Sequence, residues 1–298
     1  MKKIAIAAAL AVTSLVASAQ VTVSGKVSQW VDSTSTGGNK VTAMPLEPTS
    51  NIGFTAREDL GNGLSARAVV ETSLRGNTVD GSNNTQLGDR QSTVGLANRL
   101  GSVDLGRNVH SQFLAVSNND PFNTLYGSVA GDVHNLRGLR FSNGTFISVS
   151  PIAGMTATYD RSNNAPGQAD ATAASVSGRL AMINATAAVY ESGAEKSTVV
   201  GANTKFGNTT VSYVHSDNQS LTVGETKKGD LVGVAHKIGA YTAKASYGRT
   251  NTEVKAYNLG VDYALSKRTE VGVAYRNVNL AGTSQDIKQI GAGLTLRF

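Results

Sequence analysis

Five charged side chains lie in segments whose residues alternate between apolar and polar types. Arg67, Arg90 and Arg140 are the cations, and Glu71 and Asp104 are the acids. In the strands that such alternation predicts, neighbouring side chains point to opposite faces, so these groups belong to polar faces. Guanidinium groups attract anions and pair with carboxylates. The chemistry that the five residues offer is therefore electrostatic: they attract or repel small charged species.

Covalent and metal chemistry have little support in the sequence. The four histidines, His110, His134, His215 and His236, fall in different segments without close metal-ligand spacing, and no G-x-S-x-G elbow is found. The stretch "GNGLSA" (61–66) faintly resembles a dinucleotide loop, but it joins two predicted strands instead of opening a helix. The chain has no cysteine. We therefore expect no enzyme, no cofactor and no metal site.

Residues 1–19 have the pattern of an export signal. Lys2 and Lys3 precede an apolar run, and Ala17-Ser18-Ala19 fits the small-residue rule for cleavage. We expect residues 20–298 to form the mature, exported protein. After this region no run approaches the roughly 18 to 20 apolar residues that a membrane helix needs.

Composition favours an all-β protein. The chain has 32 glycines and five prolines, and residues that favour strands are spread along its whole length. The formal charge of +6 falls to +4 when Lys2 and Lys3 are lost, and the basic residues are scattered. Such a balance gives no reason to expect a nucleic-acid partner. Without disulfides, stability must come from an extensive hydrogen-bonded fold.

Strand-like stretches recur at intervals of about 10 to 20 residues along the chain. We count sixteen, an even number: 21–31, 50–58, 64–71, 89–97, 102–107, 139–150, 154–160, 172–180, 183–191, 197–206, 209–215, 230–237, 240–249, 253–265, 269–277 and 287–298.

The connections between these stretches alternate in length. Tight turns such as "DLGNG" (59–63), "SPIAG" (150–154) and "KIGA" (237–240) alternate with longer polar segments. We expect long connections at 32–49, 75–87, 161–171, 216–228 and 277–286. Outer-membrane barrels have short periplasmic turns, long outer loops and an even strand count. This pattern predicts a 16-stranded antiparallel transmembrane β-barrel formed by residues 20–298.

Closure of the barrel explains the last residues, "QIGAGLTLRF". In lipid every backbone group must be paired, so the first strand, 21–31, must meet the last, 287–298. We expect Leu294, Leu296 and Phe298 to face lipid, with Phe298 at the periplasmic interface as the C-terminal aromatic of barrel assembly. Tyrosines that share parity with outward apolar neighbours suit the same interfacial belts: Tyr241, Tyr247, Tyr257, Tyr263 and Tyr275.

Two segments carry a family resemblance. "GFTAREDLGNGLSARAVVE" (53–71) and "DRQSTVGLANRLGSVDLGRN" (89–108) resemble the Gram-negative general porins, in particular the branch typical of β-proteobacteria. With the export signal, "SPIAG" and the terminal Phe298, the resemblance covers essentially the whole chain. It implies a homotrimer of sixteen-stranded barrels, each with a water-filled channel that an inward-folded third loop narrows.

The longest connection, 108–137, matches the position of that third loop. An irregular segment of this length is usually functional. Asp120-Pro121-Phe122 resembles the acidic tip of the family's constriction loop, and Asp132 is a second loop acid expected to line the pore. The alternative is a long surface loop.

Strand parity and height assign further pore residues. Arg67, Arg90 and Arg140 point inward near mid-height, and Arg90 and Arg140 match positions where the family places constriction arginines. Glu71 and Asp104 face the lumen and are able to pair with them. Arg107 matches the Leu-Gly-Arg signature, but simple alternation points it outward. The alternative interpretation is that these groups are merely hydrated charges in the lumen, without effect on ion selectivity.

The sequence departs from the family where Asn51 and Thr55 stand in place of arginines. Fewer cations at the narrowest point weaken anion preference. We expect an outer-membrane porin for passive diffusion of small hydrophilic solutes and ions, mildly anion-preferring or weakly selective, in contact with lipid and lipopolysaccharide. The alternative is an exported β-rich adhesin or structural protein without channel activity.

Overall fold

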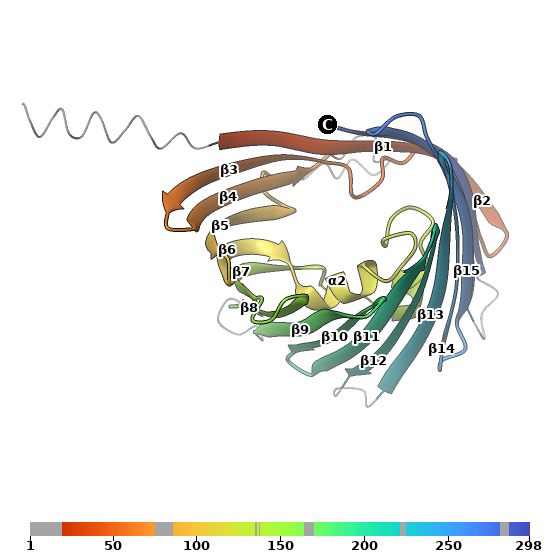
Figure 1. Cartoon of the computed structure of the whole chain (residues 1–298). Coiled ribbons are helices and arrows are strands. Elements are labelled where there is room, and N and C mark those ends of the chain that lie inside the picture. The colour runs from red at the N-terminus through yellow and green to blue at the C-terminus, as the bar shows by residue number, and fades with distance from the viewer. Residues whose placement is uncertain are drawn as a thin grey trace, which may run out of the picture.

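The computed structural model describes residues 20–74, 86–134, 136, 138–163, 170–220, 225–280 and 286–298. The expected export signal, 1–19, lies outside these residues. Strands form a ring around a central space (Figure 1). Their bounds are β1 (Gln20–Thr36), β2 (Asn39–Ala43), β3 (Asn51–Gly61), β4 (Leu64–Ser73), β5 (Gln91–Asn98), β6 (Gly101–Val109), β7 (Arg140–Val149), β8 (Met155–Ser162), β9 (Ala171–Leu180), β10 (Ile183–Ser192), β11 (Glu195–Phe206), β12 (Thr209–Ser220), β13 (Glu225–Ile238), β14 (Tyr241–Thr250), β15 (Lys255–Ala264), β16 (Thr269–Asn279) and β17 (Ile287–Arg297).

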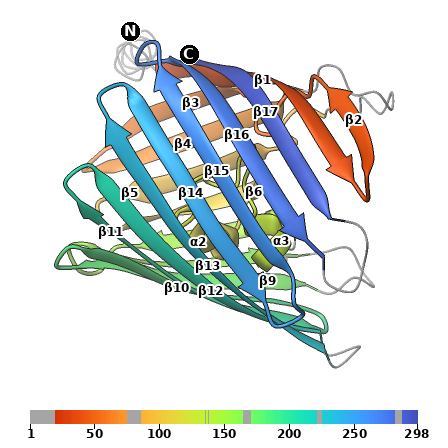
Figure 2. The ribbon, with the colours of Figure 1, turned by 90° about the vertical axis from the view of Figure 1, so that its right-hand side faces the viewer.

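The ring is closed and antiparallel, with sixteen members among the described residues: β1 and β3–β17. β2 is an additional short strand that pairs with the far end of β1. At the seam β1 pairs with β17 from Lys26↔Arg297 to Thr36↔Ile287, and Gly25 and Phe298 exchange two backbone hydrogen bonds of 3.0 Å. Figure 2 shows β1 and β17 side by side. The predicted strand count and the pairing of the first and last strands are confirmed.

Several strands continue farther than the sequence indicated. The expected long connection 216–228 is wrong, because β12 and β13 pair continuously out to Ser220↔Glu225. Likewise 32–49 is largely paired, since β1 runs to Thr36 and returns as β2. Polar side chains do not end a strand whose backbone still finds a partner, so composition underestimates strand length in this part of the barrel. The connections 75–87, 161–171 and 277–286 lie partly outside the described residues. None of the described helices is long and apolar enough to cross a membrane.

The outer face carries the expected apolar surface. Leu294, Leu296 and Phe298 are 49%, 45% and 43% exposed and alternate with the buried Thr295, which points inward. Tyrosines pair on this face at two levels: the ring centroids of Tyr241 and Tyr263 are 4.6 Å apart, and those of Tyr257 and Tyr275 are 5.9 Å apart. Apolar side chains bounded by aromatic residues are the surface that a bilayer requires.

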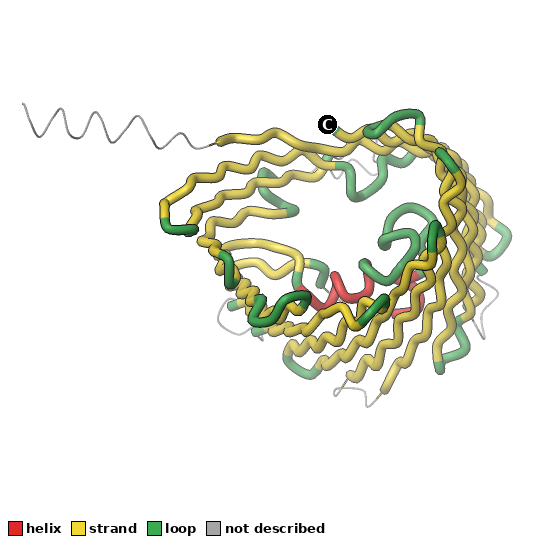
Figure 3. The backbone as a smooth tube through the Cα atoms, in the orientation of Figure 1, coloured by secondary structure: helices red, strands yellow, loops and turns green. Residues whose placement is uncertain are grey.

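The connection between β6 and β7 folds into the ring, as Figure 3 shows, and contains α2 (Ser111–Ser117) and α3 (Ala130–His134). α2 contacts β8–β11, and α3 contacts β12–β15. An internal hydrophobic cluster joins loop and wall. Its loop members are Ala115, Val116, Val129, Ala130 and Val133, and its wall members are Ala188, Val199, Val214, Leu231, Ala256 and Val278. Burial of these side chains fixes the loop against one side of the barrel and leaves the space beside β1 and β3–β7.

Inward-facing glycines make room for this loop. A Cβ at Gly201 would lie 2.5 Å from Asn119 Nδ2, and one at Gly260 would lie 2.8 Å from the Phe122 ring. A Cβ at Gly229 or Gly248 would collide with Val133, and one at Gly233 with Pro121. Because glycine adds no side chain, the loop approaches the backbone of β11 and β13–β15 directly.

Candidate channel constriction

A cavity of ≈ 720 Å³ lies between the inward loop and the opposite wall. Four cations line it: Lys26 from β1, Arg90 from the residue before β5, Arg140 from β7 and Arg276 from β16. Asp132 is the single acid among the described residues that line it. The loop and wall also contribute uncharged polar side chains, including Thr49, Asn51, Ser117, Asn123, Thr124 and Ser128.

Acids behind the cavity hold two of these cations. Lys26 Nζ lies 2.8 Å from Glu47 Oε2 and also contacts Thr49 Oγ1, while Glu47 itself is buried. Arg90 pairs with Glu71 and donates to the Pro48 carbonyl at 3.1 Å. Arg140 Nε donates to the Arg90 carbonyl at 2.8 Å. This partner is a neutral carbonyl, so the hydrogen bond orients the guanidinium group without neutralising its charge.

Asp132 faces Arg276 across the cavity rim. Their charged atoms, Asp132 Oδ1 and Arg276 Nη2, lie 3.3 Å apart, and Arg276 Nη1 also donates to the Ser128 carbonyl at 3.2 Å. Burial raises the pKa of Asp132, whereas the charges of Arg276 and Lys227 oppose that rise. Arg276 therefore holds the one lining acid and reduces its effect on passing ions.

Arg67 and Asp104 form a pair apart from this cavity. Arg67 Nε donates to Asp104 Oδ1 at 2.7 Å, and Nη2 contacts Oδ2. The two residues stand on β4 and β6, with Gly95 of β5 between them. A Cβ at Gly95 would collide with the Asp104 carboxylate. The glycine permits a bridge across three strands that neutralises both charges.

Arg107 lies at an irregular point of β6. Gly106 has φ +128°, and the pairing with β7 shifts between Gly106 and Asn108. Arg107 Nε donates to the Asp89 carbonyl at 2.6 Å and its Nη1 contacts Ser142 Oγ. It is absent from the described residues that line the cavity.

The Asp120-Pro121-Phe122 segment is packed into the wall. Asp120 is 3% exposed, and its carboxylate accepts from Phe122 N at 3.1 Å, Thr124 N at 2.7 Å and Ser128 Oγ at 2.6 Å. Burial raises the pKa of Asp120, and these hydrogen bonds oppose the rise. Phe122 is buried with its ring centroid 4.9 Å from Lys244 Nζ. The carboxylate of Asp120 thus organises the loop and does not reach the cavity.

Asn51 and Thr55 share the inward face of β3. Asn51 lines the cavity and donates to the Thr49 carbonyl at 2.8 Å. Thr55 lies farther along the strand, opposite Val69, and does not line the cavity.

Sequence reasoning missed Lys26 and Arg276. Both follow from alternation: Val23 and Val27 face outward on β1, and Val273 faces outward on β16, which places the even-numbered residues inside. The sequence did not give the position of each residue along the barrel axis. Only the folded loop shows which inward-facing residues lie beside the constriction cavity.

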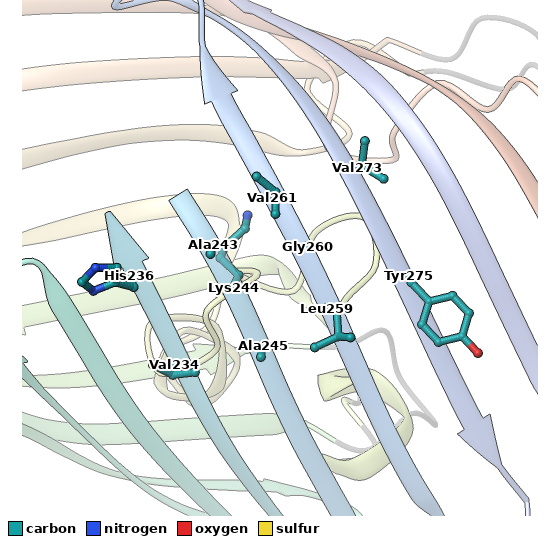
Figure 4. Close-up of a pocket in the computed structure, with 10 residues that line it drawn as sticks. All are labelled: Val234, His236, Ala243, Lys244, Ala245, Leu259, Gly260, Val261, Val273 and Tyr275. Carbon is teal, nitrogen blue, oxygen red and sulfur yellow. The ribbon is translucent and has the colours of Figure 1, made fainter. Parts of the chain in front are cut away.

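A second depression, of ≈ 480 Å³, lies on the outer face of β13–β16. Figure 4 shows Ala243 and Ala245 on β14 between the larger side chains of neighbouring strands, including Val234 and Leu259. Its exposed apolar members belong to the lipid-facing surface and not to the channel.

A closed barrel with an internal loop and a lined passage defines a channel-forming outer-membrane protein. The sequence matches the family of Gram-negative porins over residues 5–283, and the chain belongs to that family. It is located in the outer membrane and forms a channel for passive diffusion, and the adhesin alternative is not favoured.

Solved structures agree in fold. The anion-selective porin from Comamonas acidovorans is 19% identical with a TM-score of 0.80, and the match covers 94% of this chain and 100% of that one. Salmonella typhi OmpF, in complex with daunomycin, is 17% identical with a TM-score of 0.77, covering 93% and 97%. The Rhodopseudomonas blastica porin, as a triple mutant, is 16% identical with a TM-score of 0.70, covering 94% and 100%. No curated protein matches the sequence significantly.

Proposed function

We propose that the channel admits small hydrophilic solutes with a weak preference for anions, set by Arg90, Arg140, Lys26 and Arg276. The observation that supports this is the cavity lining, in which four cations face one acid among the described residues. Glu47, Glu71 and Asp132 offset part of the positive charge. A lumen with a small surplus of cations concentrates anions only moderately. Arg67 and Asp104 contribute little, because they neutralise each other.

The test is the reversal potential of the refolded protein in a planar bilayer under a KCl gradient. The proposal is supported if the sign of the reversal potential shows that chloride is more permeant than potassium and if the permeability ratio is modest. A clear potassium preference contradicts it. Wild-type protein purified with its native lipids serves as the reference for correct folding.

We also propose that residues 1–19 are removed on export and that the mature chain forms a homotrimer. A trimer form of OmpT, an outer-membrane protein of Vibrio cholerae with the same fold and a TM-score of 0.71, supports the assembly. Native mass spectrometry of detergent-extracted protein tests both points, because it reports the subunit mass and the number of subunits. A monomer that conducts would contradict the trimer.

Lipopolysaccharide is a proposed partner of the outer face. Arg249 and Lys255 are direct register partners on β14 and β15, beside the paired Tyr247 and Tyr257. Arg249 is exposed, and its Nε lies 3.8 Å from Asp230 Oδ2. Like charges directly opposite each other are unfavourable, whereas a lipid phosphate above an aromatic belt stabilises both. Co-purification of lipopolysaccharide should fall when both cations are replaced by glutamine.

A further inference from the structure

Apolar side chains lie among the polar residues that line the constriction cavity. Phe113 from α2, Leu125 from the loop and Leu139 beside β7 line the same cavity as Arg90 and Arg140. Phe113 and Leu125 are only half-buried, and Leu139 is 41% exposed. Barrel interiors of open channels are usually polar. Apolar side chains at this position therefore call for an explanation beyond ion conduction.

The cause is the way in which the loop is anchored. α2 buries Ala115 and Val116 against the wall, which turns Phe113 on its other side toward the cavity. Asp120 is held within the loop by three hydrogen bonds, so its charge is withdrawn from this face. The cavity thus has cations on the barrel wall, and on the loop it has the apolar Phe113 and Leu125 beside polar side chains.

This arrangement matches a particular class of solute. A carboxylate binds guanidinium groups through charge-assisted hydrogen bonds, and an aromatic or branched hydrocarbon group buries its surface against Phe113 and Leu125. The cavity volume of ≈ 720 Å³ lies within the range of small-molecule sites. We propose that the constriction binds amphipathic organic anions, with a carboxylate on Arg90 and Arg140 and an apolar body against Phe113 and Leu125. This inference rests on the proposed anion preference.

The test compares block of the chloride current by three probes: benzoate, acetate and benzyl alcohol. Benzoate has both chemical groups, acetate has the carboxylate with one methyl group, and benzyl alcohol has the ring without charge. Benzoate should reach half-block at a concentration about tenfold lower than acetate, since a buried ring adds apolar contact area. Benzyl alcohol should not block. Equal half-blocking concentrations for benzoate and acetate would overturn the inference.

Two variants locate the effect. Phe113→Ser and Leu125→Ser should each move the ratio of the benzoate and acetate half-blocking concentrations toward one. Leu114→Ser is the matched control, because Leu114 is the exposed neighbour on α2 that does not line the cavity. A ratio unchanged in both cavity variants, or changed equally by Leu114→Ser, would refute the loop site. Two separate positions keep the test valid if one variant fails to fold.

The same recordings separate the two proposals. A channel that prefers potassium, or that does not conduct, fails the proposed function. A channel that prefers chloride but shows no preference for benzoate over acetate fails only this inference.

Discussion

Arg67 on β4 pairs with Asp104 on β6 across the glycine that occupies position 95 on the strand between them. Asp104 is 5% exposed and Arg67 is 40% exposed at their side chains. The pair removes one cation from the electrostatics of the lumen. Residues that face the water therefore contribute to selectivity only through the charge left after such pairing.

Removal of the acid should expose that hidden cation. In Asp104→Asn the Arg67 charge has lost its carboxylate partner. A unit charge at 4 Å in water changes the energy of an ion by about 1 kcal/mol. The preference for anions should therefore rise by at most about fivefold. The reversal potential under a KCl gradient measures it. The control is Asp170→Asn, which removes an exposed carboxylate paired with Arg161. An unchanged potential in Asp104→Asn would show that Arg67 is too far from the ion path to matter.

The two loop acids should behave differently. Asp120→Asn removes an acceptor of three hydrogen bonds in a buried turn, and a buried hydrogen bond of this kind contributes about 1 kcal/mol or more. We expect lower thermal stability and noisier current with little change in selectivity. Asp132→Asn should instead increase anion preference, because it frees Arg276. If Asp120→Asn changed the reversal potential more than Asp132→Asn did, the structural role of Asp120 would be wrong.

The inward-facing glycines that contact the loop predict that a single added methyl group changes the conductance at some positions and not at others. Gly233→Ala places a Cβ into Pro121, whereas a Cβ at Gly53 meets its nearest neighbours at 3.6 Å, an ordinary contact. Both glycines face the lumen on strands. We expect Gly233→Ala to shift the loop and alter unitary conductance, and Gly53→Ala to behave as wild type. Single-channel recordings of the two variants test this prediction. Identical conductance would mean that the loop does not pack against β13 as described.

Acidification should loosen the loop through His134. This side chain is fully buried in α3, its Nδ1 lies 2.8 Å from Ser216 Oγ, and burial lowers its pKa to about 3. A histidine whose folded pKa is depressed stabilises the fold above its ordinary value of about 6.5, and this contribution is lost as pH falls toward 3. Asp230, His215 and Lys227 also act on its charge. The raised pKa values of Asp120 and Asp132 work in the opposite direction, because their contribution is present at low pH and lost as pH rises.

Current noise at pH 7 and pH 4 measures this effect. The wild-type channel should become noisier at pH 4, and His134→Gln should reduce the difference. His236→Gln is the control, since His236 is exposed and bonds Thr209 Oγ1 at 2.7 Å. If His134→Gln kept the full response to pH, another group would control the loop.

The sequence was sufficient for the barrel because its signals are local. Alternation identifies strands and their outward faces, and the need to pair every backbone group joins β1 to β17. Composition misjudged 216–228, because the end of a strand depends on whether the neighbouring strand continues, and local polarity does not report this. Height within the barrel was equally hidden, which is why Lys26 and Arg276 were missed.

The loop was the least predictable part. Its length and the Asp120-Pro121-Phe122 motif indicated an inward fold, but the direction of each loop side chain depends on packing against distant strands. Asp120 accepts three hydrogen bonds from its own loop, while Pro121 and Phe122 occupy space left by Gly233 and Gly260. Contacts of this kind join residues more than 100 positions apart and follow from no short sequence pattern.

The most direct test of the central claim is the reversal potential of wild-type protein and of Arg90→Gln/Arg140→Gln in the same KCl gradient. Charge on the barrel wall sets the ion preference in this account. The wild-type channel should favour chloride modestly, and the double variant should lose that preference or favour potassium. The heat-dependent gel mobility of the double variant should show that its barrel is still folded. The same chloride preference in both proteins would contradict the account.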